Sequence, residues 1–165
     1  MNRLQTLLVF ALAATFCIPS AFAYKQGTKA VAFGLNGVDS DLSISGQFGY
    51  YIIDYLEVGA QGGIDNGDET LWQVGPYAEY YIAALKNMSG LPLLPYVGTS
   101  GTYYNFDGES FTGYSGYAGL RYHVNSSFAI YGAYEQRFAD EDIFVDDGEL
   151  TDSDGHFRYG VRFFF

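Results

Sequence analysis

Residues 155–165, Gly-His-Phe-Arg-Tyr-Gly-Val-Arg-Phe-Phe-Phe, alternate between two kinds of side chain up to the end of the chain. One set is apolar throughout: Phe157, Tyr159, Val161, Phe163 and Phe165. The residues between them are His, Arg, Gly, Arg and Phe. A period of two predicts a β-strand whose two faces meet different surroundings. An edge strand of an ordinary globular domain would be the alternative explanation.

The first residues have the pattern of a secretory signal peptide. A basic start at residues 1–3 precedes an apolar run over 4–18, and small residues at 19–23 form a cleavage site. We expect residues 1–23 to be removed after Sec export, which leaves 24–165 as one domain. The apolar run is too short for a membrane anchor. Cys17 leaves with this segment, so the mature chain has no disulfide and no thiolate metal site.

The composition is acidic and aromatic. The formal net charge is −11, from 19 acidic and 8 basic residues, which argues against a nucleic-acid partner because such partners require a basic surface. The chain holds 16 Tyr, 14 Phe and 21 Gly, while charged residues make up 16%. After the leader, no apolar run approaches the roughly 18 residues of a spanning helix. If the chain crosses a membrane, it does so with strands.

Alternating runs continue through the whole mature chain. They cover residues 28–36, 42–52, 55–64, 71–82, 94–105, 111–124, 127–138 and 155–165. Eight runs of about ten residues predict an all-β fold, an eight-stranded antiparallel up-and-down transmembrane β-barrel. Pro76 interrupts the fourth run and predicts a local distortion. Acidic and Gly/Asn-rich connections after every odd run predict long loops at one end, with both termini at the other, periplasmic end.

The alternation alone does not say which face points inward, and a lipocalin-like barrel would place the apolar face inside. The other face is mostly Gly, Ala, Ser and Tyr, with fewer charges than a water-facing surface carries. Aromatic residues of the apolar face gather near the strand ends, as in the two belts of a membrane barrel. They are Tyr50, Tyr80, Tyr122, Phe128 and Phe165 at one end, and Trp72, Tyr114, Tyr134, Phe138 and Phe157 at the other. We therefore expect the apolar face to point outward into lipid.

An outward apolar face places charged residues inside the barrel, where they must pair. The expected interior ion-pair network consists of Glu57, Glu79, Arg121, Glu135, Arg137, Arg158 and Arg162. Four tyrosines should fill much of the remaining space: Tyr51, Tyr77, Tyr117 and Tyr131. An eight-stranded interior is just wide enough for such side chains. The network then acts as a structural plug, and a conducting pore lined by the same charges is the alternative.

The mature chain resembles the small eight-stranded outer-membrane β-barrel proteins of the OmpA/OmpX-type and opacity-like group. The similar strings are 49–51, 56–59, 74–77 (Val-Gly-Pro-Tyr) and 95–98 (Pro-Tyr-Val-Gly). The resemblance implies the bacterial outer membrane, reached through the periplasm, and contact with its lipids and lipopolysaccharide. It also implies insertion by the barrel assembly machinery, which reads a terminal aromatic strand, here Tyr159, Val161, Phe163 and Phe165. We expect a monomer.

Members of that group serve envelope integrity, adhesion and solute passage, and a few modify lipid A. A lipid A deacylase or palmitoyl transferase needs His and Ser at the outer end. His123 is expected at the periplasmic end, with Asn125 where a deacylase has Ser, and His156 lies near Ser153 and Asp154 without a recognisable motif. No phosphate loop or His/Cys metal spacing is present. We predict no catalytic residue, no cofactor and no metal site.

The acidic segment 139–154 lacks the spacing of an EF-hand. It either binds divalent cations loosely, bridging to lipopolysaccharide, or is only solvated. The function expected from the sequence is non-enzymatic, in envelope structure or surface interaction. A narrow pore is the first alternative, and an outer-membrane lipid A-modifying enzyme is the second.

Overall fold

The structure is a computed structural model that describes residues 24–38, 41–66, 70–82, 93–106, 109–141, 144–146 and 149–165. The expected leader 1–23 and the connection 83–92 lie outside these residues. Among the described residues, no helix is long and apolar enough to cross a membrane.

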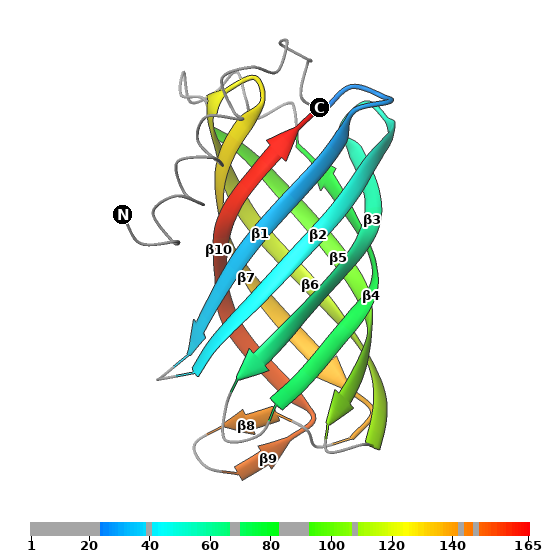
Figure 1. The fold of residues 1–165 in the computed structure, drawn as a ribbon, viewed down its shortest axis with the longest axis vertical. Coiled ribbons are helices and arrows are strands. Elements are labelled where there is room, and N and C mark those ends of the chain that lie inside the picture. Colours follow the sequence, from blue (N-terminus) through cyan, green and yellow to red (C-terminus); the bar gives the residue numbers. More distant parts are fainter. Residues whose placement is uncertain are drawn as a thin grey trace, which may run out of the picture.

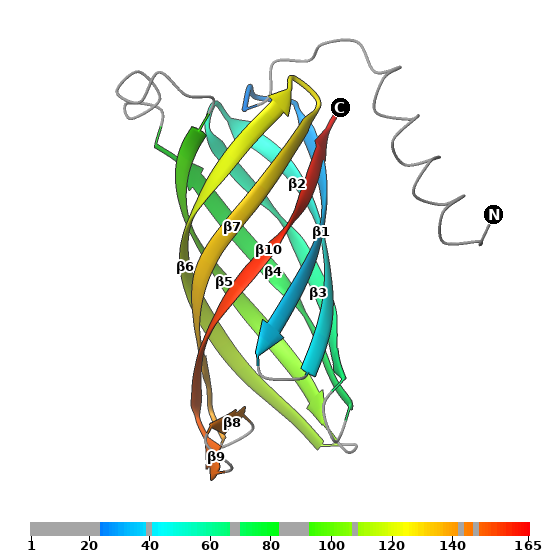
Figure 2. The ribbon, with the colours of Figure 1, turned by 90° about the vertical axis from the view of Figure 1, so that its left-hand side faces the viewer.

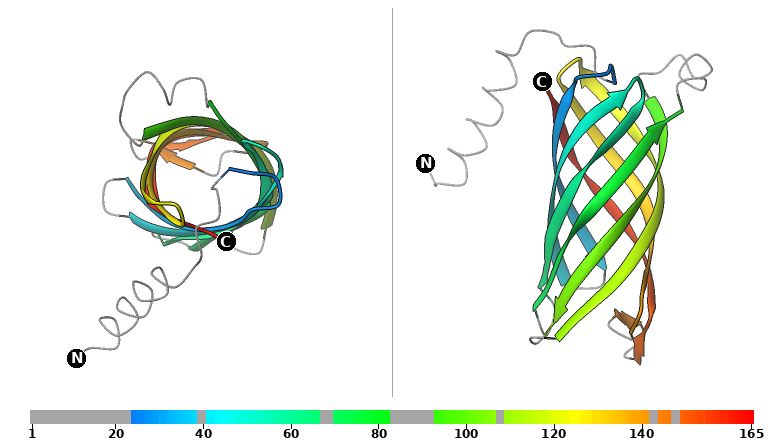
Figure 3. Two further views of the ribbon diagram at one scale, coloured as in Figure 1. Left: turned by 90° about the horizontal axis from the view of Figure 1, so that it is seen from above. Right: turned by 90° about the vertical axis from the view of Figure 1, so that its right-hand side faces the viewer.

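Eight antiparallel strands close into a single barrel, seen from above in Figure 3. The ring order is β1-β10-β7-β6-β5-β4-β3-β2. Each barrel strand therefore pairs with the barrel strands before and after it in the sequence, and the first and last strands, β1 and β10, pair to close the ring. That pair joins β1 to β10 from Ala30↔Phe164 to Asn36↔Arg158. The strands are β1 Lys29–Val38, β2 Asp41–Ile53, β3 Leu56–Asn66, β4 Thr70–Tyr81, β5 Leu93–Phe106, β6 Glu109–Asn125, β7 Phe128–Ala139 and β10 Ser153–Phe164. The predicted eight-stranded up-and-down barrel is confirmed.

The two ends of the barrel differ (Figures 1 and 2). We call one the terminal end, because Tyr24 and Phe165 lie there beside the tight β2–β3 and β6–β7 turns. Tyr55 makes the first turn with a positive φ of 67°. We call the other the hairpin end, because the two-stranded sheet of β8 Phe144–Asp146 and β9 Glu149–Thr151 lies there.

The prediction of long loops after every odd run is wrong at three places. Strands β1 to β6 extend beyond the predicted runs and leave only residues 39–40, 67–69 and 107–108 between them at the hairpin end. Pairing continues here because polar strand ends can keep their ladder hydrogen bonds after leaving an apolar layer. The connection between β7 and β10 is long, and the β8–β9 hairpin within it was not predicted.

The apolar face points outward, as predicted. Phe157 is 68% exposed and Trp72 56%, whereas their strand neighbours Arg158 and Leu71 are buried. All ten predicted belt aromatics are exposed or half-buried. Pro76 does interrupt its strand: the β4–β5 ladder stops at Val74↔Tyr103 and resumes in the same register at Tyr77↔Ser100. The distortion is therefore a local gap in pairing without a bulge.

Candidate functional site

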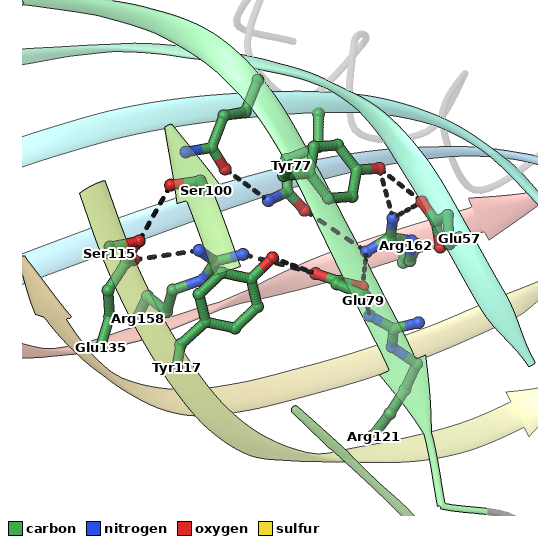
Figure 4. A network of polar contacts seen from close by, with 12 residues as sticks. Glu57, Tyr77, Glu79, Ser100, Ser115, Tyr117, Arg121, Glu135, Arg158 and Arg162 are labelled. Atoms are coloured by element: carbon green, nitrogen blue, oxygen red, sulfur yellow. Dashed lines mark hydrogen bonds and ion pairs between the residues drawn. The ribbon is translucent and has the colours of Figure 1, made fainter. Parts of the chain in front are cut away.

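Three carboxylates and three guanidinium groups fill the middle of the barrel (Figure 4). We call this group the interior network. It consists of Glu57 on β3, Glu79 on β4, Arg121 on β6, Glu135 on β7, and Arg158 and Arg162 on β10. No member is more than 6% exposed. The signs balance, so no member is a buried charge without a counter-ion, the situation that is most costly in an interior.

Glu79 is the point at which the three arginines meet. Its Oε2 accepts from Arg121 Nη2 at 3.1 Å and from Arg162 Nη1 at 3.0 Å. Its Oε1 lies 3.7 Å from Arg158 Nη2. Glu79 therefore joins β4 to both β6 and β10 through the interior.

The other two carboxylates lie at opposite ends of this arrangement. Arg162 Nη2 reaches across to donate to Glu57 Oε1, and the same guanidinium donates to Tyr77 Oη at 2.9 Å. Glu135 Oε2 accepts from Arg158 Nη1 at 3.0 Å, and its Oε1 accepts from Ser115 Oγ at 2.5 Å. The result is one connected set of ion pairs across five strands.

Tyrosine side chains complete the packing. Tyr81 donates to Glu79 Oε2 at 2.5 Å, and Tyr117 donates to Glu79 Oε1 at 3.3 Å. The guanidinium carbon of Arg158 lies 4.3 Å from the Tyr117 ring centroid, and that of Arg121 lies 4.6 Å from the Tyr81 ring. These are favourable cation–π contacts. The four tyrosines expected inside are all buried, as are Tyr81, Tyr96 and Tyr104.

Two inward-facing glycines leave room for these side chains. A Cβ on Gly49 would lie 1.8 Å from Glu57 Oε1 and 2.3 Å from Tyr77 Oη. A Cβ on Gly98 would lie 2.2 Å from the Tyr117 ring. These two glycines were not predicted as interior residues of importance, although they lie two residues from Tyr51 and Tyr96 and therefore on the same strand face.

An aromatic cluster closes the interior at the terminal end. The Tyr24 ring centroid lies 4.4 Å from that of Tyr81 and 5.5 Å from that of Phe164. Tyr24 Oη is hydrogen-bonded to His123 Nε2. Tyr24 is only 6% exposed although it precedes β1, because it packs inside the terminal end of the barrel with the buried tyrosines and Phe164.

At the hairpin end, Arg137 lies outside the interior network. It was predicted as a member of the interior ion-pair network, but its Nη2 donates to Asp154 Oδ2 at 2.5 Å. The same oxygen accepts from His156 Nδ1 at 3.0 Å. Asp154 was counted with the acidic loop, so its part in this contact was missed. Its spacing from His156 puts both on the same strand face and was the available signal.

A polar chamber lies between the interior network and the hairpin end. It has a free volume of about 20 Å³ and is lined by amides and hydroxyls on one side and by charged groups on the other. The lining residues include Gln47, Gln61, Gln73, Thr102, Glu135, Arg137, His156 and Arg158. Phe144 of β8 is buried against Tyr104, with ring centroids 5.7 Å apart, and against Arg137 at 4.8 Å.

Three of the predicted assembly-signal residues, Tyr159, Val161 and Phe163, lie along the outward face of β10, and Phe165 directly follows this strand. Tyr159 and Phe165 are 51% and 45% exposed, and Val161 and Phe163 are half-buried. Within the described ranges, no group of three or more His, Cys, Asp or Glu side chains is placed to hold a metal ion.

A closed antiparallel barrel with an apolar exterior, aromatic belts and a polar interior is the architecture of transmembrane β-barrels. No family model and no curated protein matches the sequence. Solved structures do match. The N-terminal β-barrel domain of Pseudomonas aeruginosa OprF has a TM-score of 0.67 at 18% identity, over 85% of this chain and 98% of that one.

Two further structures have the same fold. Neisserial surface protein A has a TM-score of 0.55 at 16% identity, over 82% of this chain and 94% of that one. A de novo designed transmembrane β-barrel has a TM-score of 0.56 at 20% identity, over 86% and 98%. The fold is thus that of small eight-stranded outer-membrane barrels. Because a designed barrel shares it, the fold alone does not define an activity.

Proposed function

We propose that the protein is a non-enzymatic, monomeric barrel of the bacterial outer membrane whose interior is sealed by the interior network. In this orientation the terminal end faces the periplasm and the hairpin end faces outward. Its role is in envelope structure or surface interaction, in contact with outer-membrane lipids and lipopolysaccharide. The Sec pathway and the barrel assembly machinery would deliver it.

The observation that carries this proposal is the complete burial of a charge-balanced network across the barrel. Glu79, Arg121 and Arg162 are at most 1% exposed and bond directly to one another through Glu79. A conducting pore needs a continuous water path with solvated charges, and these side chains occupy that position. The cluster around Tyr24 lies across the same axis at the terminal end.

The two alternatives fit less well. A narrow pore would have to displace both the interior network and the Tyr24 cluster. A lipid A-modifying enzyme would need its His exposed to the outer leaflet. His156 instead is 3% exposed and faces the chamber inside the barrel, and His123 lies at the terminal end.

Conductance of the purified, refolded protein in planar bilayers tests the proposal. We expect the wild type and the exposed-site control Glu141→Gln to give no steady current. Glu135→Gln should lower the free energy of unfolding and still give no steady current. A stable wild-type conductance whose ion selectivity changes in Glu135→Gln, with no loss of stability, would mean that the charges line a pore.

A further inference from the structure

The β8–β9 hairpin lies at the hairpin end of the barrel and forms a sheet of its own (Figure 1). It pairs from Phe144↔Thr151 to Asp146↔Glu149, and within the described residues it has no ladder to a barrel strand. A two-stranded hairpin is marginally stable by itself in water. Phe144 is buried, at 4% exposed, whereas its partner Thr151 is half-buried. The position of the hairpin therefore depends on the side chains that surround Phe144.

Three barrel strands build the seat of Phe144. Leu71 on β4 and Tyr104 on β5 are buried and form one apolar cluster with Phe144. The Phe144 and Tyr104 rings meet edge to face, with centroids 5.7 Å apart and planes at 86°. On β7, the guanidinium carbon of Arg137 lies 4.8 Å from the centroid of the Phe144 ring. Edge-to-face and cation–π contacts both favour the seated ring over a solvated one.

The seat lies between the chamber and the outside. Leu71 and Tyr104 are each two residues nearer the hairpin end than Gln73 and Thr102, which line the chamber. Because inward-facing positions recur at every second residue of a strand, the seat is the next layer of side chains beyond the chamber. Arg137 belongs to both, since it lines the chamber and contacts the Phe144 ring. A seated Phe144 therefore covers the chamber on the side of β4, β5 and β7.

We propose that the β8–β9 hairpin is a lid over the chamber, that the seated Phe144 holds it closed, and that its opening gives small solutes at the hairpin end access to His156. When Phe144 leaves its seat, the eight barrel strands keep their own ladders, so the lid opens without unfolding of the barrel. Arg137 stays in place because its Nη2 also donates to Asp154 Oδ2, at 2.5 Å. The interior network lies on the other side of the chamber, so an open lid does not open a pore.

Modification of histidine by diethyl pyrocarbonate tests the lid, with the refolded protein in detergent micelles and each site measured by mass spectrometry. His156 Nδ1 is 3.0 Å from Asp154 Oδ2 and donates to it, so the reactive lone pair is on Nε2, which is buried. The reagent is too large for a free volume of about 20 Å³, so it reaches His156 only when the lid is open.

The two closed-state contacts of Phe144 predict the result. We expect His156 to be modified at least about tenfold faster in Phe144→Ala than in wild type, because the loss of a buried Phe side chain destabilises the closed state. His123, at the terminal end, is the internal reference whose rate should not change. Phe138→Ala, at a phenylalanine that is 36% exposed on the outer face of β7, is the matched control and should react like wild type.

Two kinds of result would overturn the lid. If Phe144→Ala leaves the rate at His156 unchanged, or Phe138→Ala raises it equally, Phe144 does not hold the chamber closed. If the wild type shows no nuclear Overhauser contact between the Phe144 and Tyr104 rings, Phe144 is not seated. The second measurement needs no variant, so it remains decisive even if Phe144→Ala fails to refold. Neither result depends on whether the barrel conducts.

Discussion

Glu79 accepts from Arg121 and Arg162 and also lies near Arg158, so its carboxylate balances more positive charge than any other side chain of the network. Alternation along the fourth run predicts that Glu79 faces the interior, but it does not predict which side chains Glu79 contacts there. Arg158 and Glu135 are on adjacent strands, so their pairing could be expected. The Arg162–Glu57 contact crosses the barrel and depends on its diameter and stagger, which no local pattern specifies.

We predict that Glu79→Gln lowers the free energy of unfolding by about 3–5 kcal/mol, because it leaves buried guanidinium charge without its counter-ion. Urea unfolding in lipid vesicles, followed by tryptophan fluorescence and gel mobility, measures the change. Glu141→Gln, on an exposed acidic residue at the hairpin end, should change it by less than about 0.5 kcal/mol. Equal effects of the two substitutions would contradict an energetic role for the network.

A second residue-scale prediction concerns Asp140, just beyond β7. Its Oδ1 accepts from the Thr112 amide and its Oδ2 from Thr112 Oγ1, both at 2.9 Å. These hydrogen bonds lower the pKa of Asp140 below its ordinary value. The stability they add is therefore complete above the unfolded-state pKa of about 3.9 and is lost as the pH falls through the lower folded pKa.

The Thr112 amide proton shift, followed by NMR while the pH is lowered, reports this step. We expect a midpoint below about 3.9, and no such step in Asp140→Asn. A midpoint above that value would show that the contact does not favour the ionised carboxylate.

At the scale of elements, period-two alternation identified all eight barrel strands, because each separates an apolar exterior from a packed interior. It placed the strand ends less well. Strand β6 begins at Glu109, before the predicted start at Phe111, since polar residues carry no burial signal there. The three-residue strands β8 and β9 were missed because so short a segment shows no period.

The orientation of β3 gives a paired test of the two faces. Ala60 is exposed on the outer face and pairs with Pro76, midway between the belt residues Trp72 and Tyr80, whereas its neighbour Gln61 lines the chamber. Ala60→Arg should cost roughly 2–4 kcal/mol of folding free energy in a bilayer, the value for Arg at the membrane midplane. Gln61→Arg should cost less. Denaturant titration in vesicles measures both, and the reverse order would mean that the faces are assigned wrongly.

The last strand supports a prediction about assembly. Removal of Phe165 takes away an outward aromatic whose backbone N–H donates to the Lys29 carbonyl at 3.0 Å and whose carbonyl accepts from the Lys29 N–H at 2.8 Å. We expect deletion of Phe165 to reduce the heat-modifiable barrel in the outer-membrane fraction, with synthesis and export unchanged. Phe165→Tyr, which keeps an aromatic side chain and the backbone of the last residue, is the control. Full insertion after deletion of Phe165 would exclude a role in assembly.

At the scale of the whole molecule, the two ends of the barrel differ in charge, and the interior network between them is neutral. The hairpin end carries most of the acidic residues, whereas the lysines Lys25 and Lys29 lie near the terminal end. The sequence predicts this difference in charge, because the order of the strands determines at which end each charged residue lies. The chamber could not be predicted, because it depends on which side chains from six strands leave a gap.

The cross-barrel reach of Arg162 also has a kinetic consequence. Its contacts with Glu57 and Glu79 join residues 105 and 83 positions apart in the chain, so they form only when β10 has closed the ring. Interactions that are absent from the transition state slow unfolding without speeding folding. Glu57→Gln, which removes the charge partner of Arg162 on β3, should therefore raise the unfolding rate constant and leave the folding rate constant nearly unchanged, as stopped-flow chevrons in vesicles would show. The network would then act as a latch, which sets how long a barrel persists once closed and not how fast it forms.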